Sequence, residues 1–186
     1  MQLFYTVSSE YLAAQSKSMN SLGGYVSSTK IPNDVFDNLF DELSLRTVKD
    51  AKTEYRAIVL KNESNEVAQN VQLWFVVPED AYCSCKIGAT LLNQNEDGSQ
   101  YMESISSIYS APFNTQLYDA TEDDKVTIGN MEPGQMIGLW ISRSVDKEKA
   151  IEDYNNVAER DLTTQSRYKP VTHNKEETLS LEISWD

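Results

Sequence analysis

The residues best suited to metal or redox chemistry are the two cysteines, Cys83 and Cys85, and the single histidine, His173. One residue separates the cysteines within the strand-like run YCSCKIGATLL. In a strand their thiols lie on one face, where a strain-free disulfide is hard to form. A zinc site needs ligands beyond these thiols, and His173 stands alone in a polar stretch. We therefore interpret the cysteines as buried thiols of a strand, and we predict no metal and no cofactor.

Two groups of oxygen-bearing side chains resemble cation sites. Residues 93–98 partly match a calcium loop, because oxygen ligands alternate and Gly98 takes the place of the turn glycine. The match then fails, since Ser104 stands where a bidentate glutamate is needed. We predict a plain hairpin loop there. We interpret Glu122, Asp123 and Asp124 as a solvated acidic corner.

No stretch carries a catalytic signature. Serine-based hydrolysis would have His173 alone as its base, and no serine lies in a nucleophile elbow. Gly23 and Gly24 lack the lysine and hydroxyl of a phosphate loop. Paired carboxylates for glycoside hydrolysis stay possible in a chain this acidic. We predict that the protein is not an enzyme.

The composition narrows the possible partners. Acidic residues outnumber basic ones by 29 to 16, and the net charge of −13 repels phosphate, so we predict no nucleic-acid binding. No run approaches the roughly 18 apolar residues of a membrane helix. The N-terminus has neither the basic region nor the apolar core of a signal peptide. We therefore expect no membrane contact and a location in the cytoplasm of the cell that makes the chain.

Residues 53–77 are the centre around which we expect the fold to form. In the second run of this segment, Val71, Leu73, Phe75 and Val77 fall on one face and Gln72, Trp74 and Val76 on the other, which predicts a half-buried strand. The run from Tyr55 to Leu60 is largely apolar on both faces and indicates a strand in the middle of a covered sheet. We predict that the two runs form the central hairpin of a β-sandwich.

Further strands are expected before and after this hairpin. Residues 3–7 are typical of an edge strand, and Pro133-Gly134 predicts a type II turn into a strand at 135–144. Residues 178–185 alternate cleanly between apolar and polar side chains, and we expect them to lie antiparallel to 135–144.

Residues 33–43 are predicted to form a short N-terminal helix. Asn33 or Asp34 can cap it, and apolar side chains recur at helical spacing along one face. Two interpretations are open: the helix plugs one end of the sandwich, or its apolar face meets a neighbouring subunit.

The chain is predicted to be one domain with two additions to its sandwich. Residues 1–52 form an N-terminal strand and helix extension, residues 53–144 with 178–186 form the sandwich, and residues 145–177 form an inserted arm. The arm is too polar to hold a core and too long for an ordinary connection, which is typical of functional or disordered segments. Its first half can form a short helix. The protein-interface candidates on the helix and arm are Phe36, Leu39, Phe40, Ile151, Tyr154, Arg160, Arg167 and Tyr168.

An ordered series of segments resembles a known group of proteins. The segments are SLGGYVSST, NDVFDNLFDELS, TEYRAIVLKN, NVQLWFVV, EPGQMIGLWISR and SLEISW. The series resembles virion structural proteins of tailed bacteriophages, including crAss-like phages. The resemblance implies an immunoglobulin-like antiparallel β-sandwich, mainly β, made in the host bacterial cytoplasm and built into the virion.

The resemblance also implies a role in assembly. The chain would form a homo-oligomeric ring in the head–tail connector (neck) and contact other virion proteins such as portal, neck or capsid subunits. An alternative is a capsid auxiliary, or decoration, protein. A further alternative is a carbohydrate-binding sandwich of a receptor-recognition apparatus, in which Trp74, Trp140 and several tyrosines would stack on sugars.

Overall fold

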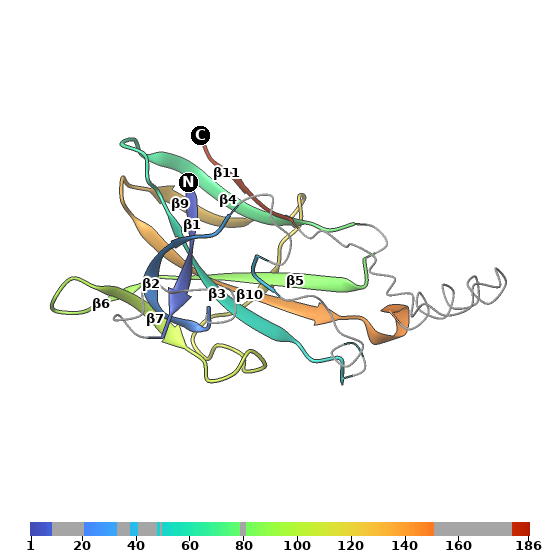
Figure 1. The fold of residues 1–186 in the computed structure, drawn as a ribbon. Coiled ribbons are helices and arrows are strands. Elements are labelled where there is room, and N and C mark those ends of the chain that lie inside the picture. Colours follow the sequence, from blue (N-terminus) through green and yellow to red (C-terminus); the bar gives the residue numbers. More distant parts are fainter. Residues whose placement is uncertain (9–20, 33–37, 41–47, 49, 79–80, 151–179) are drawn as a thin grey trace.

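The computed structural model of the chain describes residues 1–8, 21–32, 38–40, 48, 50–78, 81–150 and 180–186. This part of the chain is mainly β (Figure 1). Its strands are β1 (Gln2–Val7), β2 (Gly23–Lys30), β3 (Glu54–Lys61), β4 (Ala68–Val76), β5 (Cys83–Thr90), β6 (Asn93–Gln94), β7 (Gln100–Ser104), β8 (Tyr118–Asp119), β9 (Val126–Met131), β10 (Met136–Val145) and β11 (Ser180–Ser184).

The strands form two antiparallel sheets. The larger has the order β6-β7-β2-β1-β3-β10-β5-β8, and the smaller has the order β11-β4-β9. Figure 1 shows the smaller sheet lying above the long strands β5, β10 and β3. A core between the sheets contains Leu73 and Phe75 of β4 together with Ile58, Ile87 and Leu139 of the larger sheet. The predicted antiparallel, mainly β architecture is therefore confirmed.

The centre of the larger sheet is β3, which pairs with β1 on one side and β10 on the other. Residues from Arg56 to Leu60 are buried on both faces of this strand. A second cluster, which includes Val59 and Trp140, packs on the face away from the smaller sheet. The prediction that this run lies in the middle of a covered sheet is confirmed.

The predicted hairpin at 53–77 is wrong, although both of its strands exist. β3 belongs to the larger sheet and β4 to the smaller one. The connecting segment crosses from one sheet to the other, because β3 is already paired on both edges and β4 must turn Val71, Leu73 and Phe75 toward the core. The alternation of apolar residues therefore predicted both strands correctly, but it did not predict which strands pair with each other.

Two other strand placements also differ from expectation. β11 pairs antiparallel with β4, whereas we expected it beside 135–144. β10 has both edges occupied by β3 and β5 and leaves no room for it. β1 lies between β2 and β3 inside the sheet and is not an edge strand.

The predicted N-terminal helix is not seen. Residues 38–40 form bends, and the rest of 33–43 lies outside the described residues. The Tyr5 hydroxyl donates to the carbonyl oxygen of Asn38 at 2.5 Å, and Arg56 Nε donates to that of Leu39 at 3.1 Å. Side chains of β1 and β3 thus bind the backbone of this segment and hold it against the larger sheet.

Near the predicted arm, residues 147–150 are helical. Asp146 caps this turn, because its carboxylate accepts the N–H of Lys149 at 3.1 Å. Ala150 packs with Cys83 and Val145 at the end of the larger sheet. The predicted helix in the first half of the arm therefore begins as expected, and residues 151–179 lie outside the described part.

Candidate protein-binding surface

Among the predicted interface residues, the structure describes Leu39 and Phe40. Both are half-buried and pack against the chain's own core. This placement agrees with a segment that covers one end of the core. An interface role for the segment stays a prediction, as it does for the candidates outside the described residues, namely Phe36, Ile151, Tyr154, Arg160, Arg167 and Tyr168.

Phe40 lies near a buried ion pair between Glu54 and Arg143. These residues are cross-strand partners in β3 and β10, and Arg143 Nη2 lies 2.5 Å from Glu54 Oε2. Their side chains are only 10% and 11% exposed. The Arg143 guanidinium carbon lies 4.7 Å from the centre of the Phe40 ring. Because loss of one partner of a buried pair costs about 3–5 kcal/mol, we interpret the pair as structural.

The two cysteines lie beside this ion pair, where Cys85 is the cross-strand partner of Arg143. Neither cysteine forms a disulfide and both are buried in β5, which confirms the interpretation from sequence. Burial, with a smaller effect of Cys83, raises the pKa of Cys85 to about 12, against a lowering effect of Arg143. A thiol that stays protonated at neutral pH is a poor nucleophile and a poor metal ligand.

The predicted hairpin at residues 93–98 is confirmed, since the segment connects β6 with β7. The Asp97 carboxylate accepts the backbone N–H of Ser99 at 2.9 Å and its hydroxyl at 2.7 Å. These hydrogen bonds lower the pKa of Asp97. Within the described residues, no group of three or more His, Cys, Asp or Glu side chains is arranged to hold a metal ion.

An open surface hollow lies beside this hairpin and has a volume of about 510 Å³. Its lining carries no carboxylate, imidazole, amine or thiol. The lining residues are Tyr25, Val26, Gly98, Ser99, Gln100, Gly134 and Met136. The hollow therefore offers apolar contact and hydrogen bonds, including those of the Tyr25 and Ser99 hydroxyls, and its lining places no carboxylate or imidazole beside those hydroxyls.

The tryptophans proposed as sugar-binding platforms are partly or fully covered. Trp140 is completely buried in the cluster on the outer face of the larger sheet. Trp74 is half-buried, and the Lys125 ammonium lies 4.1 Å from its ring centre. Trp140 is therefore inaccessible to a sugar in this arrangement, whereas Trp74 is partly accessible beside Lys125.

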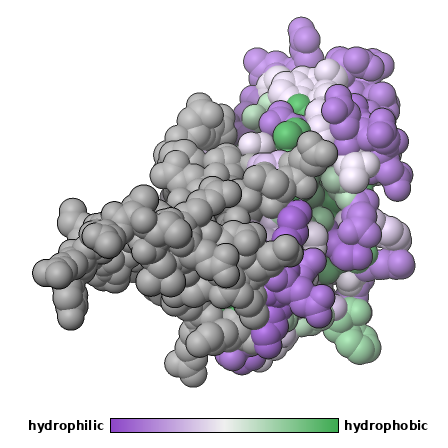
Figure 2. Space-filling model, turned by 90° about the vertical axis from the view of Figure 1, so that its right-hand side faces the viewer, coloured by the Kyte–Doolittle hydropathy of each residue, from purple (hydrophilic) through white to green (hydrophobic). Residues whose placement is uncertain are grey.

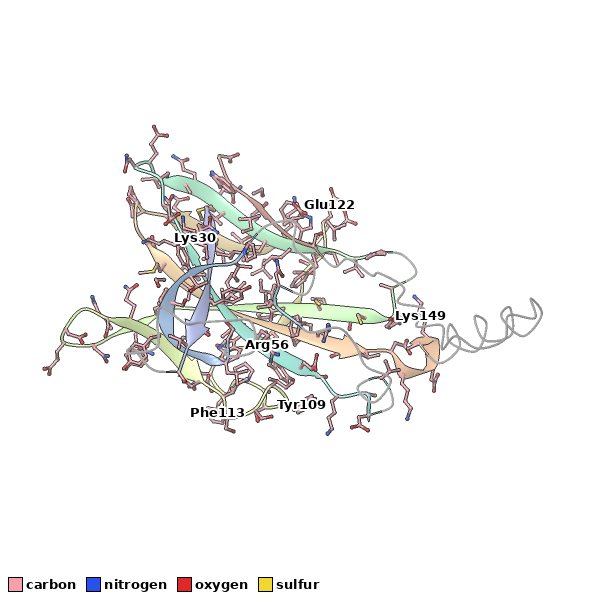
Figure 3. All side chains as sticks on the ribbon, in the orientation of Figure 1. Lys30, Arg56, Tyr109, Phe113, Glu122 and Lys149 are labelled. Carbon is pink, nitrogen blue, oxygen red and sulfur yellow. The ribbon has the colours of Figure 1, made fainter. Side chains whose placement is uncertain are left out.

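The most exposed apolar side chain in the described part belongs to Phe113, whose exposed fraction is 91%. It lies on residues 105–117, which we call the Phe113 loop, between β7 and β8. The Glu103 carboxylate accepts the backbone N–H of Phe113 at 2.5 Å and that of Asn114 at 2.9 Å. Figure 3 shows Phe113 and Tyr109 on the same side of the molecule, far from Glu122. The carboxylate on β7 thus fixes the backbone at Phe113, whose apolar side chain is exposed to solvent.

Further contacts hold the Phe113 loop against the larger sheet. The Tyr55 N–H donates to the carbonyl oxygen of Ile108 at 2.6 Å, and the Ile105 N–H donates to that of Leu22 at 2.9 Å. At Gly88 the carbonyl oxygen of Gln116 approaches so closely that a Cβ would lie 2.2 Å from it. The loop is therefore fixed near its start and near its end.

The surroundings of the loop tip are polar. Tyr109 is 46% exposed, and the Lys52 ammonium lies 4.9 Å from its ring centre. As a whole, the described surface on the side that Figure 2 presents is mostly hydrophilic, with hydrophobic areas between the polar ones. Sequence reasoning did not identify Phe113 as an exposed residue. Only the adjacent pair Pro112-Phe113 in a polar stretch hinted at it.

Comparisons of the chain with protein-family models, with curated proteins and with solved structures found no match. In the described residues, no helix has the length and apolar character needed to cross a membrane.

Proposed function

We propose that the chain is a non-enzymatic structural subunit of a tailed-bacteriophage virion, assembled with copies of itself and other virion proteins in the neck ring stack. The resemblance of its ordered segments to such virion proteins supports the choice of particle. The Phe113 loop supports a role in binding other protein chains.

The observation that carries the proposal is the fixed, exposed position of Phe113. Full burial of a phenylalanine side chain contributes about 1.5–3 kcal/mol. The Glu103 carboxylate and the contacts along the loop order the backbone before any partner arrives. Association then loses less conformational entropy, so more of the burial energy appears as affinity. Aromatic side chains of this kind are common centres of protein interfaces.

We also infer that the two sheets form an immunoglobulin-like sandwich. The packing of β4, β9 and β11 over β3, β5 and β10, with one core between them, supports this. A closed ring requires two different patches on each subunit. The Phe113 loop is one, and the predicted arm at 145–177 supplies the other.

The test compares Phe113→Ala with the matched control Leu91→Ala in the phage that encodes the chain. Leu91 is 78% exposed but lies after β5, outside the Phe113 loop. Copies of the chain in purified particles are counted by quantitative mass spectrometry, and cryo-electron microscopy locates them. We expect Phe113→Ala to reduce incorporation about tenfold, which corresponds to about 1.4 kcal/mol, and Leu91→Ala to leave it unchanged.

Two results would overturn the proposal. The first is the absence of the chain from wild-type particles. The second is equal incorporation of the two variants when circular dichroism shows that both are folded. Density over the capsid shell, in place of a ring at one vertex, would replace the neck position by the decoration alternative.

A further inference from the structure

The smaller sheet ends at β11, and the described structure pairs this strand with β4 alone. The pairing of Ser180–Ser184 with β4 is regular and has no bulge. β11 contains neither proline nor lysine, which are common means of blocking an edge strand against further pairing. The outer edge of β11 therefore has the geometry that accepts another strand.

The hydrogen bonds of β4 show which backbone groups point toward this edge. The Phe75 N–H donates to the carbonyl oxygen of Ala120 at 3.0 Å, on the side of β4 that faces away from β11. By alternation, Trp74 bonds to β11 through its cross-strand partner Glu182. The backbone groups of Leu181 and Ile183 then point away from β4, toward the open edge.

The side chains at this edge are incompletely buried. Leu181 and Ile183 pack against the core but remain partly exposed. The spacing continues to Trp185, which is 47% exposed. An added strand with apolar residues on its inner face would bury more of these side chains, while its outer face would lie beside the exposed carboxylate of Glu182.

The negative charge at Glu182 and of the whole chain favours a basic strand over a second copy of β11 at this edge. If β11 of a second copy overlapped it completely in antiparallel register, Glu182 would lie opposite Glu182, and like charges in that position destabilise a sheet. Two molecules that each carry −13 also repel one another. A segment with basic residues beside Glu182 meets neither obstacle.

We infer that the open edge of β11 binds an extended segment of a partner protein in which apolar and basic residues alternate. The segment adds a strand to the smaller sheet by backbone hydrogen bonds to Leu181 and Ile183. This inference names the partner's chemistry at a second surface and rests on the assembly role proposed above.

The test uses the full chain and the synthetic peptide KVKVKVK. Amide hydrogen exchange by NMR reports on each backbone group, and fluorescence anisotropy of labelled peptide gives the affinity. In the free chain we expect protection of the Glu182 N–H and fast exchange at Leu181 and Ile183. The peptide should protect the latter two. Glu182→Lys should weaken binding about fivefold, because an attractive cross-strand pair becomes repulsive.

The matched control is KVKVKVK methylated at the valine amides, which keeps the side chains and charge but removes the donors that face β11. It should not bind. Equal binding of the methylated peptide would reduce the effect to charge attraction and overturn the inference, as would protection of Leu181 and Ile183 in the free chain. Phe113→Ala should leave peptide binding unchanged, so failure of this inference is distinguishable from failure of the proposed function.

Discussion

Asn62 is the residue whose replacement tests the fold most sharply. It follows β3 where the chain crosses between the sheets, and it is 1% exposed. Its side-chain amide donates to the carbonyl oxygens of Met131 at 2.9 Å and Glu66 at 2.8 Å. Its side-chain oxygen accepts the N–H and the hydroxyl of Ser64. Asn62 thereby ties the crossing to the end of β9.

The expected cost of Asn62→Ala follows from these partners. Glu66 and Ser64 are exposed and regain water, so each lost bond there costs little. Met131 is completely buried and is the cross-strand partner of Ala68, so its carbonyl stays in the sheet and loses only the bond from Asn62, at a cost of about 1 kcal/mol. With the smaller losses at Glu66 and Ser64, we expect a total loss of about 2 kcal/mol in the free energy of unfolding. In a chain of this size that lowers Tm by about 4–8 °C.

The assay is urea unfolding followed by circular dichroism, with Asn93→Ala as the control. Asn93 is exposed in β6, and its replacement should change the free energy of unfolding by less than about 0.5 kcal/mol. The m-value should stay constant, because both variants expose the same surface on unfolding. If Asn62→Ala were as stable as Asn93→Ala, the crossing would not depend on this network, and the reasoning would be refuted.

Two more predictions concern the larger sheet. The pKa of Cys85 rises from 9.0 in the unfolded chain to about 12 in the folded one, so its contribution to stability is complete below pH 9 and is lost between pH 9 and 12. Urea midpoints of wild type and Cys85→Ala across this range measure it, and parallel curves would contradict it. Gly88→Ala places a Cβ 2.2 Å from the Gln116 carbonyl oxygen and should destabilise the chain by about 1–3 kcal/mol. NMR shifts confined to the neighbours of residue 88, with none in the Phe113 loop, would show that the loop is not held there.

Local patterns were sufficient to predict most strands and one turn. Val71, Leu73 and Phe75 alternate with more exposed residues, and β4 buries these three as expected. Pro133-Gly134 forms the predicted turn: Gly134 has a φ of 77°, and the Gln135 N–H donates to the carbonyl oxygen of Glu132 at 3.0 Å. These features depend on residues within a few positions of each other, so the chain encodes them directly.

Strand neighbours and the exposed loop depended on contacts between distant residues. A period of two assigns each side chain to a face but does not identify the strand that lies alongside. This is why β3 and β4 could be mistaken for a hairpin and β11 could be placed beside β10. The helix expected at 33–43 is not seen in its described residues, 38–40, where Tyr5 and Arg56 instead bind the backbone at Asn38 and Leu39.

By itself the sequence determined that this protein is a mainly β chain with buried cysteines and a strongly acidic composition. The alternation of apolar residues and the count of charged residues are properties of the sequence and do not depend on which segments lie side by side. Only the tertiary structure showed that the Phe113 side chain is exposed to solvent. Its position depends on Glu103, ten residues earlier, and on the missing Cβ of Gly88. Tertiary structure also left β11 at an edge, because both sides of β10 were already paired.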